Sequence, residues 1–86
     1  MTRIEYMSFI GTNRDNQYCC VFDDFESAFA FYKDTDFKRA HDLLSKQETF
    51  DEHDHTFKRL DRVEFHDNDT TEVDVIMFET YDEMED

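Results

Sequence analysis

Apolar residues recur along the chain with two different periods, and these periods predict four strands and two helices. Residues 3–11 and 17–23 are rich in aromatic and branched side chains, and the polar residues 12–16 between them are typical of a turn. Residues 57–66 and 70–81 repeat this arrangement around the turn sequence Asp67-Asn68-Asp69. Because both connections are short, each pair of strands is expected to form an antiparallel hairpin.

The segment between the two hairpins carries apolar residues at helical spacing. One helix is expected over residues 24–33, with Asp23 and Glu26 resembling a capping box at its start. A second is expected over 36–47, although one kinked helix would fit the same pattern. The expected apolar faces consist of Phe25, Ala28, Phe29 and Tyr32 in the first helix and Phe37, Ala40, Leu43 and Leu44 in the second.

The order of elements predicts an α+β domain, with a four-stranded antiparallel sheet (ββααββ order) and two short helices packed on one of its faces. In the third strand the alternation of apolar residues breaks between Leu60 and Val63, which indicates a β-bulge. In the fourth strand we expect two faces, with Val73, Val75 and Met77 on one and Asp74, Ile76 and Phe78 on the other.

Length and composition favour one folded domain. The chain has 86 residues, and its ten Phe and four Tyr can supply a core despite a hydrophobic content of only 38%. We expect the domain to span 1–81 and the acidic residues 82–86 to be a frayed tail. No apolar run suits a signal peptide or a membrane span. The adjacent Cys19 and Cys20 would point to opposite faces of a strand, so they are expected to be reduced, apolar packing residues of a cytoplasmic protein.

The net charge of −14 is the feature that bears most directly on function. Solubility of a small domain needs a net charge of only about 2–8. Charge beyond that amount destabilises the compact state, because the like charges repel one another. From Val63 onward the chain has no Lys or Arg, and other acids gather around the first expected helix. The residues expected to contact a partner are Asp23, Asp24, Glu26, Asp34, Asp36, Glu64, Asp67, Asp69, Glu72, Asp74 and Glu79.

Other kinds of chemistry have weaker support. His53 and His55 lie among acids without the spacing of a metal site, and the calcium-loop pattern that begins at Asp67 fails at Glu72 and Phe78. Neither cysteine has a local catalytic motif, so we expect no enzyme activity. We also expect no bound metal and no cofactor. Without a basic stripe, direct binding to nucleic acid is not expected, and neither is binding to a membrane. A homodimer through an exposed edge strand stays open.

In size and charge the chain resembles small acidic bacteriophage proteins that imitate DNA or block nucleases, CRISPR effectors or host transcription. This resemblance implies a non-catalytic inhibitor, acting in the host bacterial cell, that binds a basic nucleic-acid-binding protein such as a nuclease, a CRISPR effector or a transcription factor. Carboxylates spaced along a strand can stand where phosphates stand in DNA. The alternative is a protein–protein binding module that contacts a host factor such as RNA polymerase through aromatic anchors, with the acids serving solubility and steering.

Overall fold

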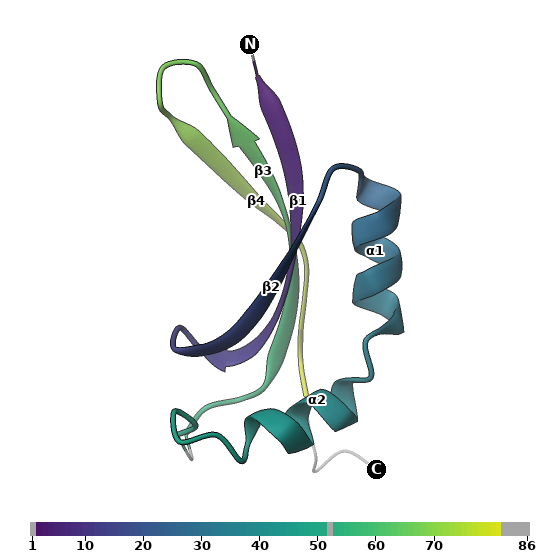
Figure 1. Cartoon of the computed structure of the whole chain (residues 1–86), viewed down its shortest axis with the longest axis vertical. Coiled ribbons are helices and arrows are strands. Elements are labelled where there is room, and N and C mark those ends of the chain that lie inside the picture. The colour runs from purple at the N-terminus through teal and green to yellow at the C-terminus, as the bar shows by residue number, and fades with distance from the viewer. Residues whose placement is uncertain (1, 52, 82–86) are drawn as a thin grey trace.

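The computed structural model describes residues 2–51 and 53–81 (Figure 1). The elements are β1 (Arg3–Asn13), β2 (Asn16–Phe22), α1 (Phe25–Asp34), α2 (Phe37–Leu44), β3 (Phe57–Phe65) and β4 (Thr71–Thr80). The strands form one antiparallel sheet in the order β2-β1-β3-β4. The predicted α+β class and element order are confirmed, with two separate helices. The expected tail, 82–86, lies outside the described residues.

The two hairpins join through their first strands, so β1 and β3 form the middle of the sheet and β2 and β4 form its edges. One row of paired residues crosses all four strands. Phe22 on β2 lies opposite Tyr6, Tyr6 lies opposite Arg62 on β3, and Arg62 lies opposite Asp74 on β4. Three inter-strand steps of about 4.8 Å separate the two edges by about 14 Å. The start of α1 directly follows β2, so it lies across the sheet from the acidic edge strand β4.

Both helices begin at an aspartate that caps them. The Asp24 carboxylate accepts hydrogen bonds from Ser27 N at 2.8 Å and Ser27 Oγ at 3.0 Å, and Asp36 Oδ1 accepts one from Arg39 N at 3.1 Å. The predicted capping box at Asp23 is therefore wrong by one residue, because it is the side chain of Asp24 that reaches the free N–H groups of the first turn.

Helix α2 is shorter than its apolar pattern predicts and ends at Leu44. After it, Lys46 N donates to Leu43 O at 3.3 Å and Gln47 N donates to Leu44 O at 3.1 Å. These bonds span three residues rather than four, so the chain continues in tighter turns. Among the described residues, neither helix has the length and apolar character that a membrane crossing requires.

A bulge in the β3–β4 pair changes which residues of β4 share a face. Leu60 pairs with Met77, but the next residue, Asp61, pairs with Val75. Ile76 is thus an extra residue on β4, and the faces of this strand exchange at that point. The predicted grouping of Val75 with Met77 is wrong for this reason, although the break in alternation after Leu60 correctly indicated an irregularity.

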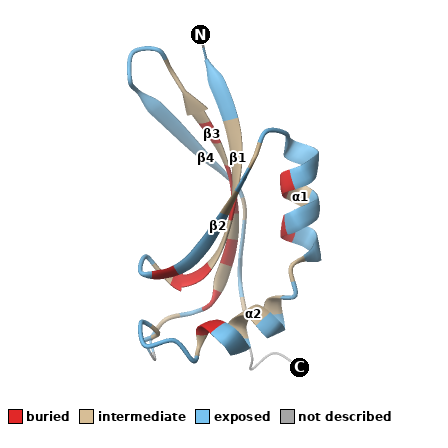
Figure 2. Ribbon diagram, viewed as in Figure 1, coloured by how far each residue is buried: buried red, intermediate tan, exposed pale blue. Residues whose placement is uncertain are grey.

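The hydrophobic core lies between α1 and one face of the sheet (Figure 2). Ala28 and Tyr32 from α1 meet Leu60 from β3, and all three are at most 2% exposed. The partly buried residues around them are Tyr6, Phe22, Phe29 and Met77. The aromatic stripe of the first helix therefore packs as predicted, except that Phe25 at its end is 39% exposed.

The opposite face of the sheet is also apolar, and neither helix covers it. By register this open face carries Met7, Phe9, Cys19, Val21, Phe57, Val63, Phe65, Val73, Val75 and Phe78. Val75 and Phe78 are each 56% exposed, and the ring centroids of Phe57 and Phe78 lie 5.9 Å apart. Asp61 lies at the centre of this face, only 2% exposed, with Arg59 Nε 2.9 Å from its Oδ1.

Replacing Leu60 by Ala tests the position of the core. Leu60 is fully buried, so its truncation should lower the free energy of unfolding by about 2–5 kcal/mol through lost burial and a residual cavity. The control Leu43→Ala changes a residue that is 56% exposed and should cost about 0.5 kcal/mol. Urea denaturation of both variants measures the difference, and equal losses would contradict this core.

The buried Asp61 should leave a signature in the pH dependence of stability. Burial raises the pKa of Asp61 above its ordinary value, and Arg59 offsets only part of that rise. The folded protein thus protonates Asp61 more readily than the unfolded chain does. The ionised form costs stability at neutral pH, and the cost is relieved as the pH falls through the folded-state pKa.

We therefore expect the wild type to gain free energy of unfolding relative to Asp61→Asn as the pH is lowered below 7. Urea denaturation of both proteins across this range measures the difference, in which the titration of the other acids cancels. A difference that stays constant, or that moves in favour of the variant, would show that Asp61 is not disfavoured as a carboxylate.

Candidate partner-binding surface

The tip of the β3–β4 hairpin is an acidic turn held by its own hydrogen bonds. Asn68 Oδ1 accepts from Thr70 Oγ1 at 2.6 Å, and His66 N donates to Thr70 O at 3.0 Å. Asp69 has a φ of 64°, a left-handed conformation that aspartate tolerates in turns. The predicted turn is confirmed, and it holds the exposed Asp67 and Asp69 at the end of the hairpin.

Behind this tip, two exposed acids follow the outer edge of the sheet. The Glu72 side chain is 68% exposed and the Asp74 side chain is 75% exposed. They share one face of β4, which places them about 6.6–6.8 Å apart along the strand. Asp74 lies 3.9 Å from Arg62, at the limit of an ion pair. Because β4 is an edge strand, both carboxylates are open to an approaching molecule.

The basic residues of β3 do not cancel this charge, because they are held at the middle of the sheet. The Lys58 side chain is 11% exposed, Arg59 pairs with the buried Asp61, and Arg62 lies 3.3 Å from Glu64. Each of them thus has an acid of β3 or β4 within ion-pair distance, and Lys58 also donates to the Tyr32 carbonyl. The exposed acids at the tip and along β4 therefore present a field that the cations of the sheet reduce only in part. The tip and β4 acids Asp67, Asp69, Glu72 and Asp74 are called the hairpin acids below.

Glu79 was expected to contact a partner, but it has internal contacts. Its Oε2 accepts a hydrogen bond from Tyr32 Oη at 2.9 Å and lies 3.5 Å from Lys58 Nζ. Burial, followed by the hydrogen bond to Glu79, raises the pKa of the Tyr32 hydroxyl well above its ordinary value. Glu79 thus joins β4 to α1, and it remains half exposed beyond that contact.

Five of the other expected contact residues lie in two places separate from the hairpin acids, whereas Glu64 lies opposite Glu72 in the β3–β4 register. Asp23, Asp24 and Glu26 lie at the start of α1, which follows the β2 edge. Asp34 and Asp36 lie where α1 meets α2, one α1 length away, or about 15 Å for its ten residues. The structure therefore gathers the hairpin acids but does not unite all eleven expected residues in one patch.

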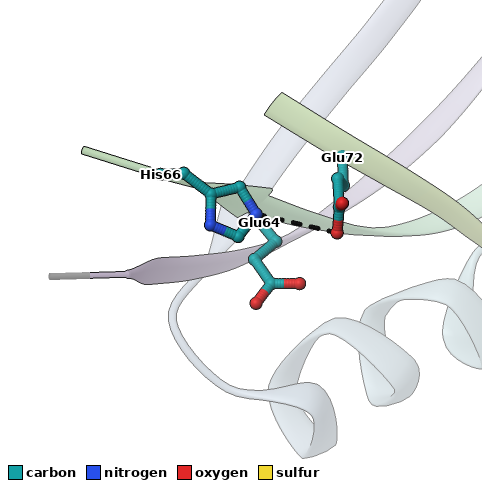
Figure 3. A group of neighbouring side chains, drawn as sticks. All are labelled: Glu64, His66 and Glu72. Carbon is teal, nitrogen blue, oxygen red and sulfur yellow. Dashed lines mark ion pairs between the residues drawn. The ribbon is translucent and has the colours of Figure 1, made fainter. Parts of the chain in front are cut away.

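One group of side chains at the hairpin has the composition of a metal site (Figure 3). Glu64, His66 and Glu72 each offer a ligand atom, and these atoms all lie within 4.8 Å of one another. Both glutamates were expected to contact a partner, whereas His66 was not among the expected site residues. In a hairpin centred on the Asp67-Asn68-Asp69 turn, positions 64, 66 and 72 lie on the same face. This shared face is the sequence signal from which the group could have been predicted.

The two cysteines are free and lie on opposite faces of β2, as predicted. Cys19 is exposed rather than packed, because β2 is an edge strand and the face that carries Cys19 is uncovered. Partial burial, the neighbouring Cys20 and then Asp61 raise the pKa of the Cys19 thiol above its ordinary value, with Arg59 opposing the rise. A raised pKa keeps the thiol protonated and disfavours it as a nucleophile.

Alanine variants should separate the acids that hold the fold from the acids that are free to bind. Asp24→Ala and Asp36→Ala each remove a helix cap and should lower the free energy of unfolding by about 1 kcal/mol. Asp23→Ala, the neighbouring control, removes the same charge without a cap and should cost much less. Thermal or urea denaturation measures the losses, and an equal effect of Asp23→Ala and Asp24→Ala would overturn the assignment of the cap.

No family model, no curated protein and no solved structure matches the chain.

Proposed function

We propose that this protein is a non-catalytic inhibitor that occupies the nucleic-acid-binding surface of a basic protein by imitating the charge of DNA. The observation that carries the proposal is the separation of charge at the β3–β4 hairpin. The hairpin acids are exposed, while Lys58, Arg59 and Arg62 have shorter contacts with Glu79, Asp61 and Glu64 than the 3.9 Å that separates Arg62 from the hairpin acid Asp74. A nuclease, a CRISPR effector or a transcription factor has the complementary positive surface.

The dimensions and spacing of the protein suit this role. The molecule is elongated, with principal extents of 45 × 24 × 17 Å, and at 3.4 Å per base pair its long axis matches roughly 13 base pairs. Glu72 and Asp74 repeat at the spacing of alternate strand residues, about 6.6–6.8 Å, which is on the scale of neighbouring phosphates. The sheet holds these positions in place, so a partner would meet a preformed row of charge.

Electrostatics would govern how such a complex forms. The net charge of −14 attracts a basic partner over long range, so association should be fast at low salt and should slow as salt is added. Internal ion pairs at Arg59 and Arg62 are less exposed to the solvent and should change less. Salt should therefore weaken binding without unfolding the protein.

The first experiment captures partners from a bacterial lysate, with and without an excess of duplex DNA.

Each neutralisation among Asp69→Asn, Glu72→Gln and Asp74→Asn should then lower the affinity for the captured protein by about 0.5–1 kcal/mol, so the triple variant should bind roughly tenfold or more weakly. Fluorescence anisotropy or calorimetry at two salt concentrations measures this. The control neutralises three exposed acids elsewhere, Asp15→Asn with Asp42→Asn and Glu48→Gln, and should have a smaller effect.

Two results would contradict the proposal. One is a captured partner that duplex DNA cannot displace. The other is a triple variant that binds as tightly as its charge-matched control, because then total charge matters and the hairpin acids do not form the contact.

A second candidate function is a protein-binding module that uses the open sheet face. The observation that favours it is the exposure of Val21, Val73, Val75 and Phe78 on a face that neither helix covers. Exposed apolar clusters mark protein–protein contacts. Here one or two anchors should dominate binding, so Val75→Thr or Phe78→Ser would abolish capture of a host factor such as RNA polymerase, whereas the triple acid variant would retain it.

A further inference from the structure

Three side chains converge at the hairpin end from two strands. Glu64 lies directly opposite Glu72 in the β3–β4 register, and His66 follows Glu64 by two residues, so it points to the same face. The His66 ring lies beside Glu72 across the hairpin, with Nε2 at 3.6 Å from Glu72 Oε2 (Figure 3). The backbone of the hairpin thus holds the three side chains close together.

In this group, neither the His66 Nε2 atom nor the repulsion between the two glutamates is fully compensated. Two glutamates at directly opposed positions repel each other and destabilise a strand pair. Arg62 lies 3.3 Å from Glu64 and compensates that carboxylate, whereas the contact of Glu72 with His66 is longer, at 3.6 Å. The His66 Nε2 atom is withdrawn from solvent and has no hydrogen-bond partner among residues 2–51 and 53–81. In the tautomer that leaves Nε2 without a proton, its lone pair is available to a metal ion beside two carboxylates.

We propose that Glu64, His66 and Glu72 bind a divalent first-row transition ion, for which Zn²⁺ is the representative. One imidazole and two carboxylates are ligands that zinc accepts, whereas Mg²⁺ and Ca²⁺ prefer oxygen alone. Ligand atoms at about 2.0–2.2 Å from a tetrahedral ion are about 3.4 Å from one another, close to the 3.6 Å between His66 Nε2 and Glu72 Oε2.

Only a small movement completes the set. The three ligand atoms lie within 4.8 Å of one another, so the widest separation exceeds the 3.4 Å of a tetrahedral site by at most about 1.4 Å. The Glu72 side chain is 68% exposed at a sheet edge and is free to adjust. Three protein ligands leave a fourth position for water, which is the pattern of an open rather than a closed zinc site. The bound ion would join β3 to β4 and neutralise the opposed glutamates.

This site does not depend on the proposed function, because it is defined by the chain alone and needs no partner. Its test is zinc titration of the full-length protein by calorimetry, under reducing conditions and with excess Mg²⁺ to occupy weak carboxylate sites. The variants are His66→Gln and Glu72→Gln. The matched controls are His53→Gln with His55→Gln, which remove the other exposed histidines that lie among acids, and Cys19→Ser with Cys20→Ser, which removes the thiols.

We expect one zinc ion per chain, with affinity reduced at least about tenfold in His66→Gln and in Glu72→Gln and retained in both controls. The ring nitrogens of His66 should shift in ¹H–¹⁵N NMR spectra on zinc addition, and the melting temperature should rise by several degrees in the wild type but not in His66→Gln. Zinc affinity that survives His66→Gln, zinc affinity that is lost in a control, or no stoichiometric binding at all would overturn the proposal.

Discussion

One buried cation, Lys58, fixes how the two halves of the chain fit together. Its ammonium group donates to Tyr32 O at 3.1 Å near the end of α1, where the helix dipole favours positive charge. It also lies 4.5 Å from the centroid of the Tyr32 ring and 5.3 Å from that of Phe37, and 3.5 Å from Glu79. Burying a charge is costly unless it is paired in this way, so β3, β4, α1 and α2 must meet at this point.

The same requirement sorts the acids of the chain into two kinds. Glu79 and Asp61 are tied to the cations of β3, and Asp24 and Asp36 are tied to helix N–H groups. Glu72 and Asp74 on β4 have longer contacts, at 3.6 Å to His66 and 3.9 Å to Arg62. A protein with nine Lys and Arg against 23 Asp and Glu thus uses three of its cations, Lys58, Arg59 and Arg62, on contacts within the sheet. The surplus acid is left on an edge, where a partner can reach it.

Local features were predictable from the sequence, whereas contacts between distant segments were not. Alternation of apolar residues and turn residues indicated both hairpins, and the interrupted pattern after Leu60 indicated the bulge region. Nothing local showed that β1 would pair with β3, that Lys58 would be buried, or that one sheet face would stay uncovered. The same distinction holds for the candidate surface. The acids of residues 67–74 were named from the sequence, whereas the internal role of Glu79 and the position of His66 depend on strand register.

The extra residue Ile76 changes the edge that β4 presents to a second strand. Residues 75–78 form an apolar run, Val75-Ile76-Met77-Phe78, in an edge strand, and apolar edge segments of high β-propensity are prone to stack into amyloid. The bulge at Ile76 disturbs the even spacing of N–H and C=O groups that a fibril would need, and Glu72 and Asp74 repel a second identical edge. Straightening this strand by deleting one residue would turn a protected edge into a template for aggregation.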